Sequence, residues 1–71
     1  MKGGGTITTR VEEIRKERGL TQTELARRLG VQQSTISLIE NEERTPSAGL
    51  LLKIADELGV TIDELINRKA G

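Results

Sequence analysis

The chain has 71 residues, and its eleven Lys and Arg balance eleven Asp and Glu for a formal net charge of zero. That length fits one small domain. Cysteine, histidine and aromatic residues are all missing, which excludes disulfides, thiol or Ser-His-Asp catalysis, the usual zinc ligand sets, and base stacking on aromatic platforms. The zero net charge argues against a protein that binds nucleic acid mainly through its overall positive charge. It does not exclude one that binds through a few accurately placed hydrogen-bond donors.

No segment is long and apolar enough to cross a membrane, and none near Met1 has the pattern of a secretory signal, so we expect a cytoplasmic protein. With these residue types missing, a pair of carboxylates is the only catalytic arrangement that the sequence could still form. Neighbouring acidic residues, such as Asp63 and Glu64, point about 100° apart on a helix and do not face one another. We therefore expect solvated surface charge, with no catalytic activity, no metal and no cofactor.

Residues 1–6 are expected to form a flexible tail, because consecutive glycines pack nothing and lose entropy when they are ordered. A folded domain is expected over residues 7–67, and residues 68–71 should fray. The sequence shows no repeat and no strand pattern. Its apolar residues are mainly Leu, Ile, Val and Ala, which favour helices packed into a small bundle.

The first helix should begin between Thr6 and Thr9. Thr9 and Glu12 fit a capping box, and Thr6 is a competing cap. Gly19 should end this helix, because glycine is favoured just past a helix C-terminus. Four apolar residues recur at roughly helical spacing: Ile7, Val11, Ile14 and Leu20.

The second and third helices are joined by a very short turn. Thr21 and Glu24 make a capping box for the second helix, which Gly30 ends. The third helix covers about residues 32–40. Two short helices joined this tightly must cross steeply, which is the helix-turn-helix arrangement. The residues expected to face inward are Leu25, Ala26, Leu29, Ile36 and Ile39.

A polar loop over residues 41–46 precedes the fourth helix, which Ser47 should cap and which runs to about Leu58. Thr61 and Glu64 form a further capping box for a fifth helix. The pattern as a whole predicts an all-α bundle of five helices.

The segment from Thr21 to Asn41, TQTELARRLGVQQSTISLIEN, resembles the helix-turn-helix of the Xre-type family, which includes lambdoid phage repressors and Cro proteins. The resemblance extends from about Ile7 to Ile66, through LLKIADELGV and TIDELI. It implies a lambda-repressor-like domain that binds double-stranded DNA and acts as a repressor-like transcriptional regulator.

The resemblance also implies roles for individual residues. The start of the third helix would meet base edges in the major groove, through Gln32, Gln33, Ser34, Ser37 and Leu38. Phosphate contacts would come from Gln22, Asn41 and Arg44, and Gln22 would also brace the third helix. An ion pair between Arg15 and Glu40 would orient that helix. The alternative for all of these residues is an ordinary polar surface.

Several positions depart from the family pattern. Many members have Ser or Thr where Gln32 stands, so the third helix should be poorly capped. Many have Arg where Leu38 stands, and a polar groove contact is missing here. The loop often reads Gly-Lys where this chain has Glu42 and Glu43, which removes a favourable glycine and reverses a charge near the DNA backbone.

A homodimer on DNA is expected, because one domain this small covers only a few base pairs. Ile62, Leu65 and Ile66 either complete the core or form the dimer interface, and at least two of the three should fill the core. Gly49 and Leu50 replace commoner polar residues, and an exposed Leu50 would be a surface residue or part of an interface.

The alternative function is an antitoxin-like or other protein-interaction module that uses the same fold and holds a protein partner. The neutral net charge and the acidic pair Glu42 and Glu43 motivate it. Salt dependence separates the two functions, because DNA binding through phosphates weakens steeply with salt.

Overall fold

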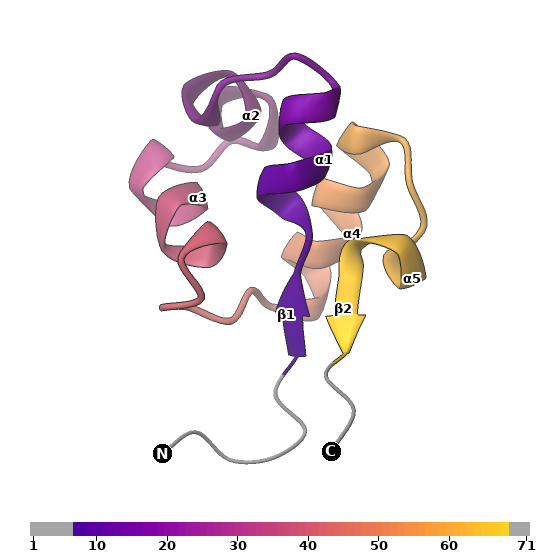
Figure 1. The fold of residues 1–71 in the computed structure, drawn as a ribbon. Helices are drawn as coiled ribbons and strands as arrows, with labels where there is room; N and C mark the ends of the chain where they lie inside the picture. The colour runs from indigo at the N-terminus through magenta and orange to yellow at the C-terminus, as the bar shows by residue number, and fades with distance from the viewer. Residues whose placement is uncertain (1–6, 69–71) are drawn as a thin grey trace.

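The computed structural model describes the backbone of residues 7–68 and the side chains of residues 9–66. Five helices pack around one core, and a short strand lies near each end of the described chain (Figure 1). The predicted five-helix bundle is therefore confirmed. In chain order the elements are β1 (Ile7–Thr9), α1 (Val11–Glu17), α2 (Gln22–Leu29), α3 (Gln33–Glu40), α4 (Ala48–Leu58), α5 (Ile62–Leu65) and β2 (Ile66–Arg68).

The two strands form an antiparallel ribbon, with Ile7 opposite Arg68 and Thr9 opposite Ile66. The expectation of a chain without strands is therefore wrong. The β-branched residues of β1 favour extended backbone, and β2 supplies the hydrogen-bonding partner that a lone strand lacks. Figure 1 shows the two strands side by side below α1 and α5.

The start of the first helix also differs from the prediction. α1 begins at Val11, and Arg10 occupies its N-cap position without a side-chain cap. The predicted capping box of Thr9 and Glu12 is therefore wrong, because Thr9 belongs to β1. The backbone N–H of Arg10 donates instead to the carbonyl of Leu65 at 2.8 Å, which ties the helix start to α5.

The C-terminal end differs in the same way. Ile66 begins β2 instead of continuing α5, and Arg68 lies in the ribbon rather than in a frayed end. The expected tail over residues 1–6, with its competing cap Thr6, lies outside the described residues, as do residues 69–71.

The other predicted caps are present. The N–H of Thr21 donates to Glu24 at 2.9 Å and the N–H of Glu24 donates to the Thr21 hydroxyl at 3.0 Å, and Thr61 and Glu64 repeat this capping box. The bonds from the threonine backbones hold the pKa values of both glutamates below their usual value. Ser47 caps α4 by accepting a backbone N–H at 3.2 Å.

All five helices contribute to the core, and the inward residues predicted for α2 and α3 are buried. Leu50, considered above as an exposed residue, is half-buried and packs against the core. Leu52 is the exposed leucine instead, at 60%. Within residues 7–68 no helix is long and apolar enough to cross a membrane. The buried apolar residues are Val11, Ile14, Leu25, Ala26, Leu29, Ile36, Ile39, Ile54, Ala55, Leu58 and Leu65.

The C-terminal apolar group mainly fills the core, as predicted for at least two of its members. Leu65 is fully buried, and Ile62 packs against the core cluster. Leu65 therefore cannot serve as a dimer contact without leaving the core, which is a correction to the candidate interface. Ile66 is half-buried at the start of β2.

Candidate nucleic-acid interface

α2 and α3 form a helix pair joined by a three-residue turn. Gly30 makes the turn possible, because it adopts a left-handed conformation at φ 75° that side chains rarely tolerate. Ile36 and Ile39 bury the inner side of α3 in the core. The opposite side of α3 is consequently turned away from the bundle.

The five predicted base-contact residues lie together on this outer side of α3. Gln32, Gln33 and Ser34 are exposed at its start, and Ser37 and Leu38 are half-exposed one turn later. Residues four apart on a helix share a face, so these side chains form one continuous surface. Gln32 holds the N-cap position, but its side chain makes no capping hydrogen bond to the helix backbone, as predicted from its type.

A buried ion pair lies beneath α3, between the residues for which the resemblance implies one. Arg15 Nε lies 2.6 Å from Glu40 Oε2, and Arg15 Nη2 donates to Glu40 Oε1 at 3.1 Å. The side chains are only 8% and 2% exposed. Arg15 Nη1 also donates to the carbonyl of Leu20 at 2.7 Å. The hydrogen bonds to Glu40 raise the pKa of Arg15 above its usual value.

Gln22 connects this ion pair to the outer surface of α3. Its Nε2 donates to Glu40 Oε1 at 2.8 Å, and its Oε1 accepts a hydrogen bond from Gln33 Nε2. The family resemblance implies that this glutamine braces the third helix as well as contacting phosphate, and these two bonds are the contacts through which Gln22 can do so. Four side chains from α1, α2 and α3 thus form one hydrogen-bonded series, which fixes the direction of Gln33.

The bond from Gln33 to Gln22 leaves part of the Gln33 amide free. An amide group has two N–H donors and an oxygen with two lone pairs, and only one donor of Gln33 is used. Its oxygen and second N–H can therefore still make the pair of bonds with which glutamine recognises adenine N6 and N7. Gln33 is held in place and keeps the groups needed for base recognition.

The loop after α3 carries the other candidate contacts. Asn41 and Arg44 are both exposed, as are Glu42 and Glu43 between them. The N–H of Glu43 donates to the Leu38 carbonyl at 2.9 Å, so the chain reverses sharply at the end of α3. Along this exposed loop the two acidic residues stand between the two candidate phosphate contacts.

Glu42 occupies a backbone conformation that suits glycine, with φ 62°, and no other non-glycine residue in the described part of the chain has a positive φ. We expect Glu42→Gly to raise the free energy of unfolding by about 0.5–1 kcal/mol, because relief of left-handed strain exceeds the added entropy of the unfolded glycine. Urea unfolding measures the change. Glu43→Gly is the matched control and should not stabilise, and equal effects of the two changes would contradict the explanation.

Within the described residues no group of three or more His, Cys, Asp or Glu side chains is placed to hold a metal ion. The acidic pairs are exposed, take part in the caps described above, or form surface ion pairs such as Arg10–Glu13 and Arg28–Glu57. The polar surface of α3, with its buried support, is therefore the strongest candidate site.

Comparison with known proteins matches residues 11–65 to the helix-turn-helix family. A relative from Archaeoglobus fulgidus, described as an uncharacterized HTH-type transcriptional regulator, is 40% identical over 59 residues, which cover 83% of this chain and 84% of the relative. The range matched by the family, residues 11–65, includes every helix from α1 to α5. The resemblance to Xre-type proteins is confirmed.

Solved structures agree with this assignment. A putative DNA-binding protein from Bacteroides fragilis superimposes with a TM-score of 0.82 at 31% identity, over 87% of this chain and 100% of that chain. SinR, described as the master regulator for biofilm formation, has been solved in complex with DNA. It superimposes with a TM-score of 0.72 at 36% identity, over 76% of this chain and 87% of that chain.

Proposed function

We propose that this chain, which belongs to the helix-turn-helix family, binds a specific site in double-stranded DNA with α3 in the major groove. It is a DNA-binding transcriptional regulator, and we propose that it acts as a repressor by occupying DNA that another protein needs. The observation that carries the proposal is the outer surface of α3, where Gln33 is held through Gln22 by the buried Arg15–Glu40 pair.

Base recognition follows from the chemistry of this surface. An α-helix fits the major groove of B-DNA, and residues at its start reach base edges first. Gln33 reads adenine through two hydrogen bonds, while Gln32, Ser34 and Ser37 add weaker polar contacts. Leu38 has no hydrogen-bonding group and rests against a thymine methyl.

Phosphate contacts fix the position of α3 in the groove. Gln22 lies at the start of α2, where free backbone N–H groups and the helix dipole favour an anion, and one N–H of its side-chain amide is still free. Asn41 and Arg44 grip the backbone from the loop after α3. In this proposal the protein works on double-stranded DNA in the cytoplasm, with no catalytic step and no cofactor.

A dimer is part of the proposal, because α3 has only eight residues and covers one half-site. Two-fold related copies would read two half-sites about one helical turn apart. Titration of a duplex that carries two half-sites should show two subunits per duplex. Full affinity of a single subunit for a single half-site would contradict the dimer.

The alternative is a module that binds a protein partner and contacts DNA weakly or not at all. The exposed Glu42 and Glu43 support it, since acidic side chains repel phosphate. The two functions differ in how the loop responds to a change of charge.

We expect Glu43→Lys to tighten binding to all duplexes about equally, because the new charge meets phosphate and no base. The slope of log binding constant against log salt concentration should become steeper by about one unit. Affinity for specific and random duplexes over a salt series measures this. Glu17→Lys on the far end of α1 is a control for net charge alone. Unchanged affinity and slope in Glu43→Lys would show that the loop does not face DNA and would favour the protein-binding module.

A further inference from the structure

The buried carboxylate of Glu40 constrains every polar group that faces it. Both of its oxygens receive hydrogen bonds from Arg15, at 2.6 Å and 3.1 Å, and Oε1 also receives one from Gln22 at 2.8 Å. An ionised carboxylate has acceptors only, and a guanidinium group has donors only. A neighbouring group that can either donate or accept must therefore donate to Glu40.

This requirement fixes which way round the Gln22 amide lies. A side-chain amide has an oxygen acceptor at one end and two N–H donors at the other. The N–H end has to face Glu40, because an amide oxygen there would meet a carboxylate oxygen with no proton between them. The Gln22 oxygen is then left facing α3, where it accepts from Gln33 Nε2.

The arrangement is passed on to Gln33, at the surface of α3. Because Gln22 offers an oxygen, Gln33 must spend one N–H on it, and keeps its own oxygen and one N–H free. A reversed Gln22 would instead draw the Gln33 oxygen inward and leave both N–H groups of Gln33 free. The two arrangements suit different bases, since adenine presents the acceptor N7 and the donor N6, whereas guanine presents two acceptors, N7 and O6.

We propose that Glu40 is a specificity-determining positioning residue, which makes Gln33 select adenine over guanine. Its side chain is only 2% exposed, so it acts through Gln22 and touches no base. The free oxygen of Gln33 accepts a hydrogen bond from adenine N6, but would meet guanine O6 with no proton between the two oxygens. This role rests on the proposed function, in which α3 enters the major groove.

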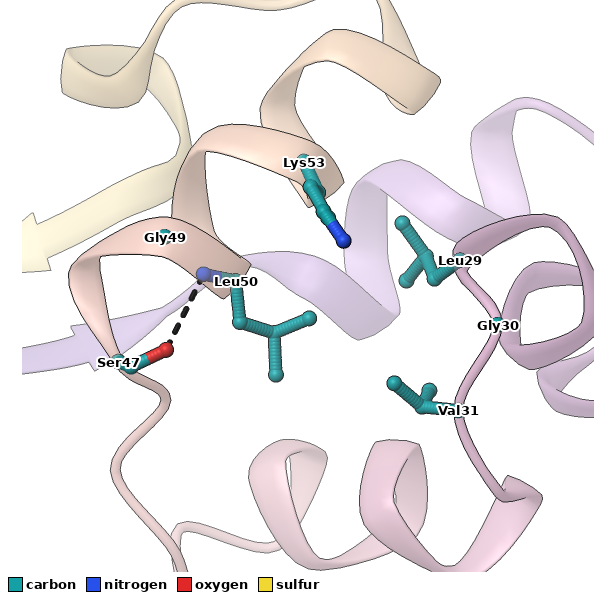
Figure 2. Close-up of a pocket in the computed structure, with 7 residues that line it drawn as sticks. All are labelled: Leu29, Gly30, Val31, Ser47, Gly49, Leu50 and Lys53. Carbon is teal, nitrogen blue, oxygen red and sulfur yellow. Dashed lines mark hydrogen bonds between the residues drawn. The ribbon is translucent and has the colours of Figure 1, made fainter.

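The turn between α2 and α3 holds the two glutamines within reach of each other, and it has its own apolar support. Figure 2 shows the side chains of Leu29 and Val31 on either side of Gly30, facing Leu50 of α4 across a shallow hollow of about 390 Å³. Leu50 packs against the core, and an apolar side chain cannot join the hydrogen-bonded series. It therefore offers a control that changes stability and leaves the series intact.

Affinities for two duplexes test the role of Glu40. Both carry the site that the natural chain enriches from a random pool, with either adenine or guanine at the position read by Gln33. The natural chain should prefer adenine about tenfold or more. The double variant Arg15→Met and Glu40→Gln removes both buried charges at constant net charge, and its neutral amide lets Gln22 lie either way round. Its preference for adenine should fall to about threefold or less.

The ratio of the two affinities cancels a general loss of binding within each variant. No preference for adenine in the natural chain, or an undiminished preference in the folded double variant, overturns the proposal. Leu50→Ala should lower Tm, because a contact with the core is lost, and should keep the natural ratio. A ratio that falls in Leu50→Ala as well would show an effect of stability alone, which also overturns the proposal.

Gln22→Met tests whether Glu40 acts through Gln22. This variant should lose most of the preference for adenine by itself, and the changes at Arg15 and Glu40 should then lower the ratio no further. A preference that survives in Gln22→Met, or that the added changes reduce as strongly as in the natural chain, would show that Glu40 acts by another route.

Nuclear Overhauser contacts in the free natural chain test the arrangement without DNA and without any substitution. The side-chain amide protons of Gln22 should contact the methylene protons of Glu40, and those of Gln33 should contact the methylene protons of Gln22. Gln22 amide protons that contact the Gln33 methylene protons instead overturn the proposal. Should the natural chain prefer no duplex at all, the proposed function fails, whereas these contacts still decide which way round Gln22 lies.

Discussion

Arg15→Ala is expected to lower the free energy of unfolding by about 3–5 kcal/mol and to weaken DNA binding as well. The change leaves the Glu40 carboxylate, whose side chain is only 2% exposed, without its ionic partner. Loss of the bond to the Leu20 carbonyl adds to the cost. DNA affinity should fall because Glu40 also receives the hydrogen bond of Gln22, which in turn holds Gln33.

A double-mutant cycle measures this coupling. Thermal or urea unfolding of Arg15→Ala, Glu40→Ala and the double variant measures three losses of stability. The sum of the two single losses should far exceed the loss in the double variant, because either change alone leaves a buried charge without its partner. Lys16→Ala is the matched control, since Lys16 forms an exposed ion pair with Glu12, and it should change stability little. Additive single effects of Arg15 and Glu40 would show that the two residues are not coupled.

Gln33→Ala is expected to cost roughly 1–3 kcal/mol of binding free energy on the preferred duplex and little on random DNA. The side chain is exposed, so its removal should leave the fold intact. Random DNA is bound through phosphates, which this change does not touch. The expected effect is therefore a loss of specificity rather than a general loss of affinity.

Gln22→Ala provides the comparison. It removes the partner that orients Gln33 and a proposed phosphate contact together, so affinity for preferred and random duplexes should both fall. Competition binding with the two duplexes separates the variants. If Gln33→Ala weakened both duplexes equally, Gln33 would act as a phosphate contact or a structural residue, and base recognition through it would be wrong.

Local sequence signals predicted much of the fold. Three predicted features depend on residues within a few positions of each other, and all three are present: the capping boxes at Thr21 and Thr61 and the turn at Gly30. The ribbon was not predictable in this way. β1 and β2 are three residues each and lie at opposite ends of the chain, so no local pattern reveals that they pair.

The candidate site was predictable only in part. Family resemblance located the outer surface of α3 and the Arg15–Glu40 pair. It implied that Gln22 braces α3 but did not identify its partners Glu40 and Gln33, which lie 18 and 11 positions away, because those contacts depend on how α2 crosses α3. The departure at Glu42 was visible in the sequence, whereas its positive φ was not.

Selection of bound duplexes from a random DNA pool tests sequence-specific recognition by α3 most directly. The natural chain should enrich a two-fold symmetric site with half-sites about one helical turn apart. Gln33→Ala should relax the enriched sequence at one position, most simply an adenine, in each half-site. Enrichment of no sequence by the natural chain, or an identical site for Gln33→Ala, would contradict recognition through this helix.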